Sequence, residues 1–135
     1  MATFDDVREL ALALPETEEG TRWGNRTWLV KGKGFVWERP LRKSDLQALG
    51  PSAPTGAILG ARTEHLVAKG AILAENPEVF FTTPHFDNYP AVLIRLDRIA
   101  PEELEEIVAE AWLAQAPKRL ADAYVRARAG EGLGL

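Results

Sequence analysis

The N-terminal part of the chain has the pattern of an amphipathic helix. Apolar residues recur at steps of three and four across residues 3–14, which places them on one helical face. Thr3 and Asp6 fit a capping box with Asp in the usual Glu or Gln position, and Pro15 ends the pattern. We therefore predict a helix over 3–14, followed by a polar connection over 16–20.

The next part of the chain predicts a β-hairpin. Residues 27–31 and 35–39 are rich in aromatic and β-branched side chains, as is typical of strands. Gly32-Lys33-Gly34 lies between them, and its glycines permit the positive φ angles of a tight turn. Residues 20–23 are predicted to add a short strand before the hairpin.

The middle of the chain predicts alternating short helices and strands. Helices are expected over 44–49, capped by Ser44, and over 63–75, which places His65 in a first helical turn. Strands are expected over three ranges, and the alternation in the last predicts one better-buried face: 57–62, 79–82 and 91–96.

Two helices are predicted at the C-terminal end. Pro101 and a run of glutamates suit the start of the first helix. Its expected buried stripe consists of Leu104, Ile107, Val108, Ala111 and Trp112. Pro117 begins a second helix, and residues 130–135 are expected to form a flexible tail.

These elements predict an α+β fold, an antiparallel sheet with helices packed on it. The chain has 135 residues, which suits one domain, here 1–129. Part of the apolar face of helix 101–115 is left as a candidate contact with a protein partner or a second copy of the chain.

Composition excludes several classes of function. The chain has no cysteine, which removes disulfides, thiolate metal sites and cysteine nucleophiles, and its two histidines do not make a common zinc site. No apolar run is long enough to cross a bilayer, and residues 1–6 lack the start of a signal peptide, so a cytoplasmic location is expected. No catalytic motif is present, so we expect no enzymatic activity, no cofactor and no metal.

Charge is concentrated in one segment. The formal net charge is −4, yet residues 22–43 contain seven bases and one acid, Glu38. These bases are Arg22, Arg26, Lys31, Lys33, Arg39, Arg42 and Lys43. The net charge argues against a generic nucleic-acid coat protein, and its distribution leaves one distinctly basic segment in an acidic chain.

The chain resembles the MmcQ/YjbR-like family of small bacterial proteins. Three segments carry the resemblance: Leu14-Pro15-Glu16-Thr17 leading into Thr21-Arg22-Trp23-Gly24; the hairpin with Phe35-Val36; and residues 84–96, followed by an acidic helix and Ala116-Pro117-Lys118-Arg119-Leu120. Together they cover nearly the whole chain. Many relatives have a His-Trp pair just before the last strand, where this chain has Pro90-Ala91.

The resemblance implies a two-layer α+β domain that binds DNA in the double-wing manner. The hairpin is then the wing, and the seven Arg and Lys residues are the expected nucleic-acid-binding residues. Aromatic side chains would stack on nucleobases or pack beneath them. The alternative is structural: Trp23, Trp28, Phe35 and Trp37 are core or cross-strand packing, and the charges are solvated or paired with the acidic helices.

A second candidate site lies in the loop over residues 84–90. His85 and Tyr89, with Arg95 on the strand that follows, have the chemistry to hold a small anion or to do acid–base work. An adaptor domain that binds a protein or a small anion through this loop is the alternative function. The structural alternative is turn chemistry, with Asp87-Asn88 making the turn and the flanking prolines stiffening it.

Overall fold

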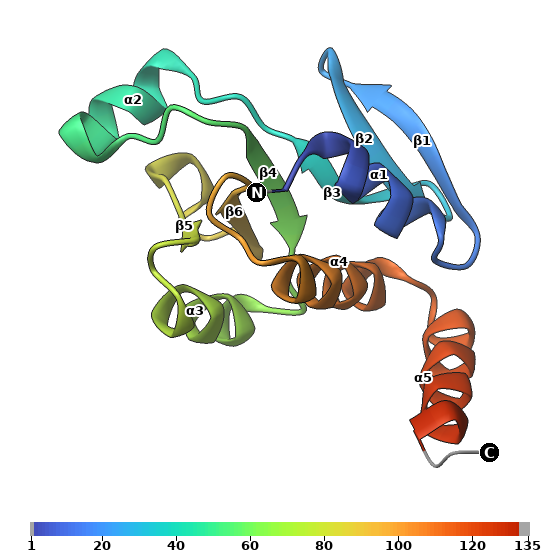
Figure 1. The fold of residues 1–135 in the computed structure, drawn as a ribbon. Coiled ribbons are helices and arrows are strands. Elements are labelled where there is room, and N and C mark those ends of the chain that lie inside the picture. The colour runs from blue at the N-terminus through green and yellow to red at the C-terminus, as the bar shows by residue number, and fades with distance from the viewer. Residues whose placement is uncertain (1, 133–135) are drawn as a thin grey trace.

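A six-stranded antiparallel sheet with the order β1-β2-β3-β4-β6-β5 forms the centre of the molecule (Figure 1). The computed structural model describes residues 2–132, with the side chains of 130–132 not described. The strands are β1 (Thr17–Arg22), β2 (Asn25–Val30), β3 (Lys33–Glu38), β4 (Ile58–Arg62), β5 (Phe80–Phe81) and β6 (Ala91–Arg95). The helices are α1 (Phe4–Leu12), α2 (Lys43–Leu49), α3 (Leu66–Glu75), α4 (Pro101–Gln115) and α5 (Lys118–Gly132). The predicted α+β class is confirmed.

One face of the sheet carries the main core, because α1 and α4 pack on it. Trp28, Val36, Ala61 and Val92 are successive register partners across β2, β3, β4 and β6, and all four are fully buried there. The predicted stripe of α4 is buried in the same core, with Trp112 fully enclosed. These α4 side chains are therefore not available for a contact with a partner.

The opposite face of the sheet is only partly covered. Thr27, Trp37, Gly60, Leu93 and Phe81 form the corresponding row of register partners on it. A second, smaller apolar cluster covers the β4–β6 end of this face, where Phe86 of the 84–90 loop packs on it. This cover explains why β6 is buried on both faces rather than on one. The β1–β3 end of the face stays open and forms one side of the groove described below.

Two tight turns shape the N-terminal half of the sheet. Trp23 and Gly24 join β1 to β2, and Lys31 and Gly32 join β2 to β3. All four residues have positive φ, as the two-residue type I′ turn of a hairpin requires. The second turn therefore lies one residue earlier than predicted, because Lys33 and Gly34 already belong to β3.

Several predicted boundaries are wrong for identifiable reasons. Residues 16–20 are not a polar connection but mostly strand β1, whose charged side chains belong to an exposed sheet edge and not to a buried face. Ser44 does not cap α2, which begins at Lys43 with Arg42 in the N-cap position. His65 precedes α3 and caps it, because its Nδ1 accepts a hydrogen bond from the backbone N–H of Ala68 at 3.0 Å.

The C-terminal helix runs away from the sheet (Figure 1). Leu120 and Tyr124 of α5 pack against the main core, and the Tyr124 ring lies 5.0 Å from that of Trp112. The predicted tail over 130–135 is helical as far as Gly132, and its remaining residues lie outside the described part of the chain. No helix within residues 2–132 has the length and apolar character needed to cross a membrane.

Candidate ligand-binding groove

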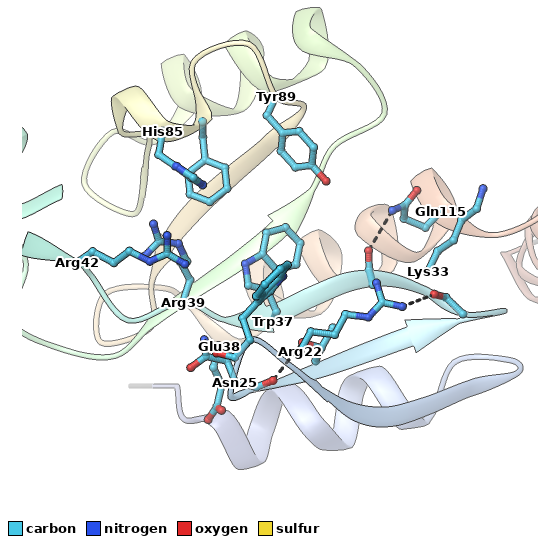
Figure 2. Close-up of a pocket in the computed structure, with 15 residues that line it drawn as sticks. Arg22, Asn25, Lys33, Trp37, Glu38, Arg39, Arg42, His85, Tyr89 and Gln115 are labelled. Carbon is cyan, nitrogen blue, oxygen red and sulfur yellow. Dashed lines mark hydrogen bonds between the residues drawn. The ribbon is translucent and has the colours of Figure 1, made fainter. Parts of the chain in front are cut away.

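A groove with a volume of about 640 Å³ lies on the open sheet face, between the hairpin strands and the 84–90 loop (Figure 2). This volume is in the usual range for small-molecule and cofactor sites. All the residues that line it except Gln115 of α4 come from the two regions that the sequence marks as candidate sites. The lining residues are Arg22, Trp23, Asn25, Thr27, Gly32, Lys33, Gly34, Trp37, Glu38, Arg39, Arg42, His85, Phe86, Tyr89 and Gln115.

Trp37 lies at the centre of the groove (Figure 2). Its cross-strand partner on β4 is Gly60, and a Cβ atom added there would lie 2.4 Å from Cε2 of the indole. The indole therefore lies directly on the bare backbone of β4, in space that any other residue at position 60 would occupy. Because this ring is half-buried, part of its surface faces the groove.

Trp23 borders the same groove from the β1–β2 turn. Its side chain is 92% exposed, and its φ of 56° is left-handed. Residues other than glycine, asparagine and aspartate are uncommon in this conformation, which costs about 1–3 kcal/mol. A large apolar side chain thus stands in solvent on a strained turn, in contrast to Trp28, which is completely buried.

Three cations of the groove take part in no ion pair among the described residues: Arg22, Lys33 and Arg42. All three are exposed. The Arg22 guanidinium donates to the carbonyl of Gly32 at 2.6 Å, which fixes its position along the hairpin and leaves its other N–H groups free (Figure 2). The groove is therefore positive where a ligand would enter.

Three other basic residues that were predicted to bind nucleic acid form ion pairs with carboxylates. Arg26 pairs with Glu38 at 2.9 Å, and Lys31 pairs with Glu16 at 3.1 Å. Arg39 lines the groove but pairs with Asp45 at 3.0 Å while both side chains are buried. The acids that pair with the hairpin come from its own strands, its flank and α2, and not from the acidic start of α4.

Lys43 and Arg95 lie outside the groove. Lys43 is the first residue of α2. The Arg95 guanidinium lies over the Phe81 ring and donates to the carbonyl of Ser52 at 3.3 Å. Arg62 stands beside Tyr89 instead, with its guanidinium 5.0 Å from the ring centroid and a hydrogen bond of 3.2 Å to the phenol oxygen. His85 and Tyr89 are at the groove and Arg95 is not, so these three residues do not form one anion site.

A buried ion pair holds the 84–90 loop against α2. The Arg39 guanidinium lies over the Phe86 ring at 5.2 Å and pairs with Asp45, whose carboxylate also accepts from the backbone N–H of Arg42 at 2.8 Å. Burial alone would raise the pKa of Asp45, but the Arg42 N–H and the Arg39 charge outweigh it and lower that pKa below 3.8. Asp45 is therefore ionised at neutral pH and fixes two groove residues.

Lys69 holds the loop from its other side. The residue is 5% exposed, and its ammonium donates to the carbonyls of Phe86 and Tyr89, the latter at 3.0 Å. Burial lowers the pKa of Lys69 below 10.5, and Asp87 opposes this in part. The far wall of the groove thus depends on one buried cation that satisfies two carbonyl groups.

We expect Lys69→Met to lower the free energy of unfolding by about 1–3 kcal/mol, because it leaves two carbonyl groups without their charged donor. Hydrogen exchange over residues 84–90 should rise with it. The wild-type protein should gain stability relative to the variant as pH approaches 10.5, since the unfolded chain then binds more protons at Lys69 than the folded chain does. Lys118→Met is the matched control, because Lys118 is 91% exposed; equal effects of the two substitutions would contradict the role of Lys69.

The sequence does not reveal that the two candidate regions, the hairpin and the 84–90 loop, line the same groove. The hairpin and the loop lie about fifty residues apart, and only the pairing of β4 between β3 and β6 brings them to one sheet face. The aromatic content of residues 22–43 left both core packing and a role at the surface open. One signal for Trp23 was present, because a Trp-Gly pair between two strand-like runs fits a turn better than a strand.

Within residues 2–132, no cluster of three metal-ligating side chains occurs.

Comparisons with known proteins found one matching family model, several similar sequences and a similar solved structure. The family model described as YjbR matches residues 12–114. Two uncharacterized proteins, from Mycobacterium bovis and Mycobacterium tuberculosis, are each 49% identical over 128 residues, with 93% of this chain and 97% of the relative covered. A Deinococcus radiodurans protein with a DUF419 domain, solved by crystallography, is similar with a TM-score of 0.61 and 18% identity, over 84% of this chain and 78% of that one. This last likeness supports the fold.

Proposed function

The chain belongs to the YjbR family, and we propose that this member is a non-catalytic domain that binds a single strand of nucleic acid in the groove of its open sheet face. One observation carries the proposal. The groove combines three cations free of carboxylate partners with exposed indole surface from two tryptophans. Basic grooves with aromatic side chains are the usual way in which proteins bind single strands without sequence preference.

The charges favour a single strand over a duplex. A hairpin wing that enters a duplex groove needs its Arg and Lys side chains together on a projecting surface. Here Arg26, Lys31 and Arg39 are paired with carboxylates, while the free cations border a hollow. A flexible strand can follow such a hollow, and its unstacked bases can reach the aromatic side chains. The DNA-binding role implied by the family resemblance is thus kept in our proposal, with a different geometry.

Fluorescence anisotropy with a labelled oligonucleotide at stepped salt tests the proposal. Three phosphate contacts predict that the logarithm of affinity falls with the logarithm of salt concentration at a slope of about −2 on a single strand. The same sequence as a duplex should bind more weakly at every salt concentration. No binding at low salt, or a slope of zero, would refute nucleic-acid binding through this groove.

A small anion with a planar ring would use the same chemistry, so oligonucleotide length separates the two ligands. Affinity should rise from a mononucleotide to a short oligonucleotide if a strand occupies the groove. Equal affinity for the two would assign the groove to a nucleotide-sized ligand instead. No acid–base pair is needed in either case, and His85 at the groove rim serves as one more donor to an anion.

A further inference from the structure

We infer that Trp23 and Trp37 form a stacking platform for one unpaired base, so that the groove binds bases as well as phosphates. The inference rests on the proposed function and deepens it, because it names the part of the ligand that each side chain meets. Two independent features support it, one for each tryptophan, and the placement of the cations supports it as well.

Folding does not account for the placement of Trp23. A type I′ turn favours asparagine, aspartate or glycine at this position, and the positive φ of 56° is strained for a bulky side chain. The indole gains no burial in return, because it is 92% exposed. The hairpin turn sets this φ, as it does at Lys31, but it does not require a tryptophan, and strained residues of this kind cluster at binding sites. A stacked base would cover the indole and supply the burial that the fold does not.

Trp37 is held in place by a glycine. Gly60 leaves room for the indole to lie on the backbone of β4, since a Cβ atom there would come within 2.4 Å of the ring. The neighbours of Trp37 in the cross-strand row, Thr27 and Gly60, are buried, whereas Trp37 keeps exposed surface toward the groove. A flat ring fixed on bare backbone is a rigid surface, and rigid aromatic rings lose little conformational entropy when a base stacks on them.

The cations surround the two indoles in a way that suits a base flanked by phosphates. Arg22 precedes Trp23 on β1, Lys33 lies on β3 with Trp37, and Arg42 reaches the groove from the segment before α2 (Figure 2). Charge comes from three elements around one aromatic centre. This arrangement is complementary to an anionic strand with a planar base at its middle, and is less suited to a purely apolar ligand.

Trp23→Asn tests the inference with two readouts that move in opposite directions. The variant should bind a single-stranded oligonucleotide about tenfold more weakly, because a base loses one stacking surface. Its melting temperature should rise by about 2–4 °C, because asparagine suits the left-handed turn better than tryptophan. If Trp23 served the fold instead, the melting temperature would fall. Val67→Asn on α3 is the control, because Val67 is 80% exposed and does not line the groove; its affinity should not change.

Gly60→Ala tests the other indole. A methyl group at position 60 displaces the Trp37 ring, so affinity should fall about tenfold as well. The matched control is Gly70→Ala on α3, where an added Cβ atom meets nothing within 4 Å. If Gly60→Ala binds as the wild-type protein does, Trp37 is not part of the platform.

Oligonucleotides without bases separate this inference from the proposed function. A strand of abasic sites should bind the wild-type protein about tenfold more weakly than a normal strand, while the salt slope stays near −2. Equal affinity for the two strands would overturn the platform and leave phosphate binding intact. Failure of both strands to bind at low salt would refute the proposed function itself.

Discussion

Replacing Asp45 with alanine is expected to lower the free energy of unfolding by about 3–5 kcal/mol. The substitution leaves the Arg39 guanidinium buried without its partner, since these two side chains are only 6% and 2% exposed. It also removes the acceptor of the Arg42 backbone N–H. Chemical denaturation at neutral pH measures the change.

The stability that Asp45 contributes should decrease as the pH falls. Since the pKa of Asp45 is lowered on folding, its contribution is complete above about pH 3.8 and is lost as pH falls through the folded value. Asp122→Ala is the control, because Asp122 is half-exposed and pairs with Lys118 four residues earlier, an arrangement worth about 0.3–0.5 kcal/mol. A loss at Asp45 no larger than that of the control would mean that the buried pair does not hold α2 and the loop together.

Removing the free groove cations is expected to have the largest effect on binding. The triple variant with Arg22→Gln, Lys33→Gln and Arg42→Gln should bind a single strand at least about 100-fold more weakly at low salt, and its salt slope should approach zero. Stability should change by less than about 0.5 kcal/mol per site, because all three side chains are exposed.

A second triple variant controls for the change in net charge. Arg98, Lys118 and Arg119 are exposed cations that do not line the groove, and their replacement by glutamine removes the same total charge. This variant should keep a slope of about −2. Equal losses in the two variants would show that binding follows net charge and not the groove.

Local patterns predicted the elements that depend on neighbours in sequence. The period of residues 101–115 identified the buried stripe of α4 down to Trp112, and the capping box of Thr3 with Asp6 is present in the structure. Both succeed because i to i+3 and i+4 spacing determines which side chains share a helical face. The charged edge strand β1 was predicted only over its last three residues, 20–22, because it buries too little apolar surface to show alternation.

The site depends on long-range packing and could be predicted only in part. Candidate residues such as Arg22, Lys33 and His85 were recognisable by type, but their convergence follows from the sheet order. Whether an Arg or Lys side chain is free or forms an ion pair depends on which carboxylate the fold brings near it. Glu38 reaches Arg26 across twelve residues through the β2–β3 hairpin, and no spacing rule for a helix or a loop would find that pair.

The four indole N–H signals provide the most direct test of the groove. Two tryptophans lie at it, whereas Trp28 and Trp112 are buried, and their indoles donate to the Glu19 carboxylate and the Pro15 carbonyl at 3.0 and 3.1 Å. In a ¹H–¹⁵N spectrum titrated with a single-stranded oligonucleotide, the signals of Trp23 and Trp37 should shift with a common affinity while the two buried ones stay in place. Binding that leaves the Trp23 and Trp37 signals unmoved would contradict a nucleic-acid site in this groove.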